Sequence, residues 1–103
     1  MSLEAFKELL ETSGFPVAYH SFPAKEDPPM PYIVYLTPYS KNFKADGIVY
    51  TSLKRMQVEL YTQFKDLEAE EKIEAALEEF YYKKSETGIE SENCYEVIYE
   101  LEV

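Results

Sequence analysis

The sequence predicts a single α+β domain, residues 1–103, in which two helices pack on a twisted antiparallel sheet of four to five strands. Apolar residues recur at helical spacing in one segment near the N-terminus and in another after residue 66. Other segments are rich in β-branched and aromatic residues, and several of them alternate between apolar and polar positions. With 103 residues, 46% of them hydrophobic, the chain can build one core and no second domain. The predicted order of elements is α-β-β-β-α-β-β.

The first helix is predicted over residues 3–11. Ser2 is a favourable N-cap residue, and Gly14 stands where a left-handed residue commonly ends a helix. Residues 17–22 are then predicted to form a short strand. The apolar stripe of this helix, which we expect to cover the sheet, consists of Leu3, Phe6, Leu9 and Leu10.

A long β-hairpin is predicted around residues 32–61, after an extended loop that holds four prolines in residues 23–31. The first strand, residues 32–36, is apolar or aromatic without clear alternation, which indicates partial cover on both faces. The return strand alternates, with apolar residues at 56, 58 and 60. Asp46 and Gly47 are typical of a two-residue turn. The hairpin is therefore expected to protrude beyond the body of the domain, with its tip at these two residues.

The outer part of this hairpin carries aromatic and basic side chains, Tyr39, Lys41, Phe43 and Lys44. Two interpretations of Phe43 stay open. It folds back onto its own core, or it contacts another chain.

The second helix is predicted from residue 67 to about residue 81, with Asp66 as its N-cap and Leu67 meeting the core near its start. We expect its polar face, which includes Glu71, Glu74 and Glu78, to be solvated, because no Glu-x-x-His element marks a metal site. The apolar stripe consists of Ala69, Ile73, Ala76, Leu77 and Phe80.

The last two strands form a predicted hairpin. Residues 82–90 are polar and contain glycine, which favours an edge strand. The final strand alternates strictly, and its inward positions are Tyr95, Val97, Tyr99, Leu101 and Val103.

The chain carries no recognisable catalytic, cofactor or metal constellation. His20 is the only histidine, and Ser21 next to it would point to the opposite face of a strand. No glycine-rich phosphate loop is present, and the single cysteine, Cys94, is interpreted as a small apolar filler. We therefore predict a protein that is not an enzyme and needs no cofactor or metal. Without a signal-peptide pattern, a membrane-length apolar run or a cysteine pair, we expect it in a reducing cytosol.

The net charge of −10 is unevenly distributed along the chain. Residues 1–65 hold seven acidic and seven basic side chains, whereas residues 66–103 hold thirteen acidic and three basic ones. An acidic half repels a phosphate backbone, so general nucleic-acid binding is not expected. A DNA-mimicking surface, or a channel wall past which DNA slides, would also be acidic.

Three segments, PPMPYIVYLTPYSKNFKADGIVY, VELYTQFKDLEAEEKIEAALEE and IESENCYEVIYELEV, resemble a family of small proteins from tailed phages and prophages of Gram-positive bacteria. Members of this family are encoded among the head-to-tail joining or tail-completion genes. The resemblance implies an α+β fold like that of tail terminators and assembly into rings, commonly hexamers. Such rings cap the tail tube, meet the head connector and let DNA pass. Synthesis in the host cytoplasm and a final place at the virion head–tail junction are implied as well.

A ring requires two different complementary patches on each subunit. We predict one on the hairpin, at Tyr39, Lys41, Phe43 and Lys44. The other is predicted on the acidic helix, at Glu71 and Glu78. Two alternatives stay open, a small acidic inhibitor or DNA mimic that binds a host enzyme, and a small-ligand regulator with a closed apolar pocket.

Overall fold

The computed structural model describes residues 2–23, 28–37, 44–45, 48–49, 55–89 and 94–103. Its two helices and seven strands follow the predicted order, with each strand of the long hairpin represented by two pieces. The elements in chain order are α1 (Leu3–Glu11), β1 (Val17–Tyr19), β2 (Tyr32–Leu36), β3 (Lys44–Ala45), β4 (Ile48–Val49), β5 (Arg55–Thr62), α2 (Leu67–Ala76), β6 (Tyr82–Ile89) and β7 (Cys94–Glu102).

The main sheet has five strands in the order β1-β2-β5-β7-β6. The α+β prediction is confirmed, and the pairs β2–β5, β5–β7 and β7–β6 are antiparallel as expected. The exception is β1, which runs parallel to β2 with Val17 opposite Ile33, so the sheet is mixed. The sequence could not reveal this, because the direction of β1 depends on how the proline-rich loop returns the chain to the sheet.

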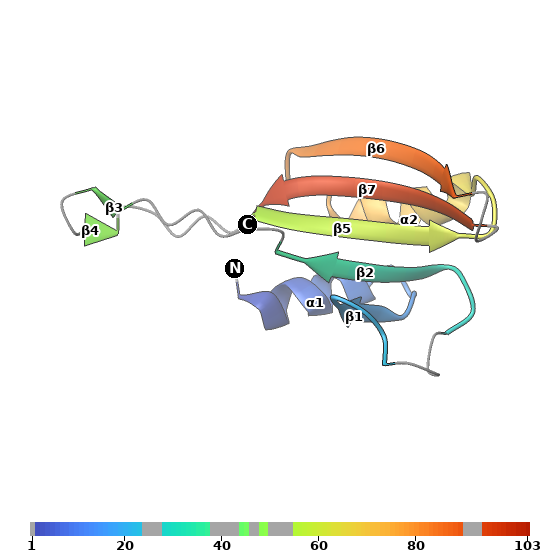
Figure 1. Cartoon of the computed structure of the whole chain (residues 1–103), viewed down its shortest axis with the longest axis horizontal. Helices are drawn as coiled ribbons and strands as arrows, with labels where there is room; N and C mark the ends of the chain where they lie inside the picture. Colours follow the sequence, from blue (N-terminus) through green and yellow to red (C-terminus); the bar gives the residue numbers. More distant parts are fainter. Residues whose placement is uncertain (1, 24–27, 38–43, 46–47, 50–54, 90–93) are drawn as a thin grey trace.

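Both helices cover the same face of the sheet. The register aligns Ile33 with Leu60 and Leu60 with Val97, so these side chains share one face. Phe6 of α1 and Ile73 of α2 join them in one buried cluster. Figure 1 shows α2 behind β5, β6 and β7, with α1 beside β1 and β2.

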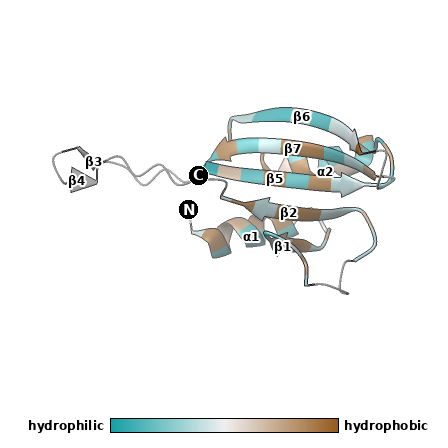
Figure 2. Cartoon of the chain, viewed as in Figure 1, coloured by the Kyte–Doolittle hydropathy of each residue, from teal (hydrophilic) through white to brown (hydrophobic). Residues whose placement is uncertain are grey.

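The opposite face of the sheet is more polar. Figure 2 shows hydrophilic and hydrophobic residues alternating along β5 and β7, whereas β6, at the edge, is hydrophilic over most of its length. The prediction that β2 is covered on both faces is confirmed, since Ile33, Val34 and Tyr35 are all buried. No described helix is long and apolar enough to cross a membrane.

The caps predicted for both helices are present. Ser2 accepts a hydrogen bond from the Ala5 amide at 3.1 Å, and Gly14 after α1 has a φ of +89°. Asp66 accepts one from the Ala69 amide, also at 3.1 Å. The helix α2 ends at Ala76 instead of about residue 81, because the chain must turn back for β6 to begin opposite Leu101.

The Asp66→Ala variant is expected to lower the free energy of unfolding by about 1 kcal/mol, because it leaves an amide of the first turn of α2 without its partner. Urea unfolding measures the loss. Asp66→Asn is the matched control, since it keeps a side-chain oxygen that accepts the hydrogen bond, and it should stay close to the wild type. Equal losses in the two variants would contradict the capping role.

The segment between the two strands of the long hairpin, residues 38–54, is called the arm below. Its described pieces, β3 and β4, form a separate two-stranded sheet. Figure 1 shows this small sheet beyond the end of the main sheet where β5 begins, and the molecule measures 49 × 29 × 23 Å along its principal axes. The predicted protrusion of the hairpin is therefore part of the fold.

Candidate interface surfaces

The described residues contain no group of three or more His, Cys, Asp or Glu side chains that could hold a metal ion. His20 follows β1 with a φ of +68° and stacks edge-on against Tyr19, with ring centroids 4.6 Å apart. Cys94 is half-buried at the start of β7. That the chain is not an enzyme stays a prediction from the sequence.

The predicted interface residues of the arm are only partly placed. Tyr39, Lys41 and Phe43 lie outside the described residues, as does the predicted turn at positions 46 and 47. Lys44 begins β3 and pairs with Val49 of β4. The next pair, residues 45 and 48, leaves two residues between the strands, which is the spacing that a two-residue turn requires.

The predicted acidic patch is exposed. Glu71 lies on α2 and Glu78 in the turn that follows, both accessible to solvent. Lys44 belongs to β3 of the arm, which lies beyond the end of the main sheet, whereas α2 packs behind the main sheet (Figure 1). The structure does not bring these two predicted patches together within one chain, so a contact between them would need a second copy.

A buried ionic network joins α2 to the sheet, and the sequence interpretation missed it. Glu70 is only 2% exposed. Its carboxylate is held by two ammonium groups, Lys65 Nζ at 2.8 Å and Lys84 Nζ at 2.7 Å. Lys84 Nζ also lies 2.9 Å from Glu74, which accepts a second hydrogen bond from the Tyr99 hydroxyl at 2.8 Å.

These contacts control the protonation of both carboxyl groups. Burial alone would raise the pKa of Glu70, but hydrogen bonds from Lys65 and Lys84 outweigh it and hold that pKa below the usual value. Burial likewise opposes ionisation of Glu74, and hydrogen bonds from Lys84 and Tyr99 lower its pKa overall. Burial and the hydrogen bond to Glu74 raise the pKa of Tyr99. The network is therefore ionised near neutral pH and attaches the helix to β6 and β7.

Two expectations for α2 were wrong. Glu74, assigned to the solvated face, is half-buried, and Leu67, expected to meet the core, is 65% exposed. A signal for the network was present, because positions 70, 73, 74 and 77 lie on one side of a helix. Two glutamates at such positions, with a lysine-bearing edge strand following, indicate a buried ionic contact.

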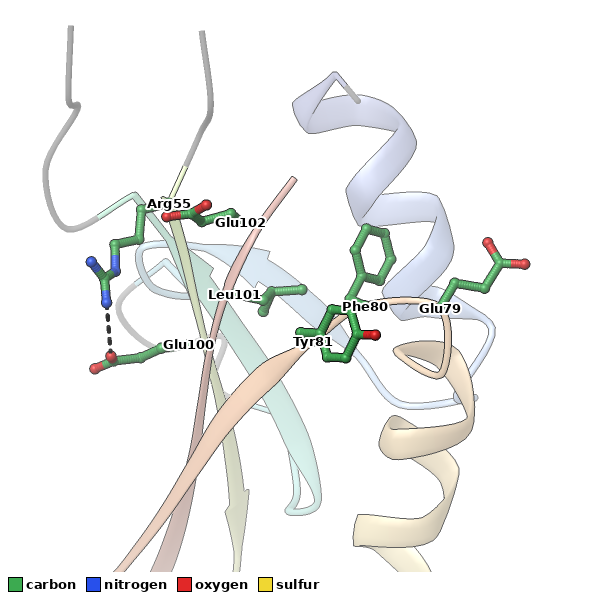
Figure 3. A pocket seen from close by; sticks show the side chains of 7 residues that line it. All are labelled: Arg55, Glu79, Phe80, Tyr81, Glu100, Leu101 and Glu102. Carbon is green, nitrogen blue, oxygen red and sulfur yellow. Dashed lines mark ion pairs between the residues drawn. The ribbon is translucent and has the colours of Figure 1, made fainter. Parts of the chain in front are cut away.

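A hollow of about 470 Å³ lies at the corner of the main sheet, and we call it the corner hollow. Figure 3 shows Leu101 and Tyr81 in its middle, with the carboxylates of β7 on one side and Phe80 and Glu79 on the other. The hollow exists because β6 starts only at residue 82, opposite Leu101. Among the described residues, the last part of β7 therefore pairs with β5 on one side and with no strand on the other. The lining residues are Arg55, Glu79, Phe80, Tyr81, Glu100, Leu101 and Glu102.

The corner hollow combines apolar and acidic groups. Tyr81 is 100% exposed and Phe80 is half-buried, whereas Leu101, which also lines the hollow, is almost fully buried. Arg55 lies 3.7 Å from Glu100, which leaves the lining acidic overall. Such an open, charged hollow is not the closed apolar pocket expected of a small-ligand regulator. The sequence interpretation did not single it out, because its residues come from three separate parts of the chain.

A second exposed apolar pair lies at the other end of the sheet, where β5 leads into α2. Phe64 is 66% exposed and Leu67 65% exposed.

Comparison of the chain with protein-family models, with curated proteins and with solved structures finds no match.

Proposed function

We propose that this protein is a non-enzymatic structural component of a tailed phage or prophage, which assembles with copies of itself into a ring that joins or terminates the tail at the head–tail interface. The sequence resemblance motivates the phage assignment. The feature of the fold that supports self-assembly is the arm, which stands apart from the core as a hairpin of its own.

The arm has a physical reason to seek a partner. An isolated two-stranded hairpin is marginally stable in water, because it buries little apolar surface. The arm nevertheless carries Tyr39, Phe43 and Tyr50. Packing against another chain would cover such side chains and stabilise the hairpin. We interpret the protruding arm as a contact element for that reason.

Charge also favours contact between copies. The arm holds three lysines and one aspartate, whereas the whole chain has a net charge of −10. A basic projection on an acidic protein is attracted to the body of the next copy. That contact is heterologous, and a heterologous contact repeated from copy to copy forms a ring when its rotation closes. Tail tube and head connector proteins would then meet the two sides of this ring.

The Lys41→Glu/Lys44→Glu variant is expected to weaken self-association by about tenfold or more, because it replaces attraction by repulsion at both lysine positions. Sedimentation velocity and native mass spectrometry of the full chain, over a range of concentrations and at low and high salt, measure the assembly. Salt should weaken the wild-type assembly, since exposed charges are screened.

The matched control is Lys7→Glu/Lys83→Glu, which makes the same change of charge at two exposed positions on α1 and β6. It should assemble like the wild type. Unchanged assembly of the arm variant would rule out the arm as the contact, and a wild-type chain that stays monomeric throughout would rule out the proposed function.

A small acidic inhibitor or DNA mimic is the second candidate. The observation that favours it is the uncovered face of the sheet, where Glu59 and Glu96 lie side by side with Tyr61. This alternative predicts a monomer or dimer that competes with DNA for a host enzyme and does not depend on the arm.

A further inference from the structure

We propose that the corner hollow is the acceptor site for the arm of a second copy of this chain. This inference rests on the proposed self-assembly and names the surface that receives the arm. Every copy would then carry one donor, the arm, and one acceptor, the corner hollow.

The position of the corner hollow makes it accessible to a neighbouring copy. Figure 1 shows β3 and β4 standing away from the ends of β5 and β7, where the hollow lies. The tip of a chain's own arm therefore does not cover it. At about 470 Å³, the hollow has the size of sites that enclose several side-chain groups.

The charge of the corner hollow complements that of the arm. Glu79 and Glu102 are exposed, and neither makes an ion pair with any residue that the structure describes. These two carboxylates stand on opposite sides of the hollow (Figure 3). Lys41 and Lys44 stand before and after Phe43 in the sequence, so the arm carries positive charge on both sides of this aromatic residue along the chain.

The apolar part of the corner hollow favours the same occupant. Tyr81 and Phe80 present apolar surface between the carboxylates of Glu79 and Glu102, with Leu101 almost fully buried beside them. Aromatic rings pack well on such a surface, and tyrosines in central positions of an interface are typical of residues that carry binding energy. Phe43, between the two lysines of the arm, is the residue that we expect to contact this surface.

The acidic residues of α2 and of the turn after it are a poorer acceptor. Glu71 is exposed on the helix, and Glu78 is exposed in the turn, beside a smaller hollow of about 200 Å³. Ion pairs between fully solvated groups contribute little. In the corner hollow the same lysines would pair beside buried apolar surface, which excludes water and strengthens the interaction. We therefore assign the acceptor to the hollow in preference to the helix.

A charge exchange tests the assignment on the full chain. Lys41→Glu/Lys44→Glu and Glu79→Lys/Glu102→Lys are each expected to weaken self-association by about tenfold or more. Their combination in one chain restores complementarity and should recover most of the wild-type assembly. Sedimentation velocity measures the association, and circular dichroism with thermal unfolding verifies that each variant is folded.

The matched control combines the same arm substitutions with Glu71→Lys/Glu78→Lys. Both fourfold variants keep the net charge of −10, so only the location of the new lysines differs. Recovery in the hollow exchange alone supports the assignment. If assembly recovers in the helix exchange, in both fourfold variants or in neither of them, the corner hollow is not the acceptor, and the proposed function still stands. If the wild-type chain is monomeric, the acceptor assignment and the proposed function are both overturned.

Discussion

The Phe6→Ala variant is expected to lose about 3–5 kcal/mol of the free energy of unfolding, the usual range for removing a buried aromatic ring from a core. Phe6 is fully buried, and its ring packs edge-on against Tyr35, with centroids 6.0 Å apart, and against Phe80, with centroids 6.4 Å apart. It is thus the residue through which α1 contacts both β2 and the segment after α2. In a domain of this size the loss corresponds to a fall in melting temperature of roughly 15–30 °C.

Urea unfolding followed by circular dichroism measures this effect. Leu67→Ala is the control, because it truncates a large apolar residue that is 65% exposed and should change stability by no more than about 0.5 kcal/mol. Since Phe80 lines the corner hollow, Phe6→Ala should also weaken self-association. A loss no larger than that of the control would contradict the central place of Phe6 in the core.

The second large effect is expected when Glu70 loses both of its ammonium partners. In the Lys65→Met/Lys84→Met variant the Glu70 carboxylate stays buried without a counter-charge. At neutral pH this should cost about 3 kcal/mol, the lower end of the range for breaking a buried ion pair, because the lysines themselves are partly solvated.

The pH dependence of stability should reverse in the same variant. In the wild type the pKa of Glu70 lies below its usual value, so ionised Glu70 stabilises the fold above an unfolded pKa of about 4.3. That stabilisation is lost as the pH falls through the folded pKa. In the variant, burial acts unopposed and the nearby charge of Glu74 adds to it, so the pKa of Glu70 rises above its usual value. Stability should then increase as the pH falls from about 7 toward 4.3.

Urea unfolding at pH 7 and pH 5 separates the two behaviours. The control Lys7→Met/Lys83→Met removes the same charge from exposed positions and should follow the wild type. A Lys65→Met/Lys84→Met variant that gains no stability between pH 7 and pH 5 would show that these lysines do not set the pKa of Glu70.

Local patterns predicted most of the fold, because the signals lie within a few residues of each other. Ser2 and Asp66 begin their helices as expected, and the alternating residues of β7 are buried at Val97, Tyr99 and Leu101. The edge position of β6 follows from its polar sequence. The parallel direction of β1 and the early end of α2 were not predictable, since both depend on where distant strands take the chain.

The candidate sites were predicted less completely. Glu71 is exposed on α2 as the helical pattern predicted, whereas Glu78, also exposed, lies in the turn after the helix instead of on it. Glu70 was missed, because a glutamate on a helix is normally solvated and its buried state depends on Lys65 and Lys84 from other elements. The corner hollow depends on the offset between the start of β6 and the end of β7, and no sequence pattern specifies that offset.

The sequence by itself determined that this chain forms one acidic α+β domain with capped helices, a buried alternating sheet and a basic, aromatic arm. These properties follow from the spacing of side chains along a helix or strand, which is a local matter. Only the tertiary structure decided that both helices share one face, that two lysines neutralise a buried glutamate, and that acidic and apolar groups meet at the corner of the sheet. Each of these depends on residues far apart in the chain, which are brought together when burial of the common core outweighs the entropy of ordering it.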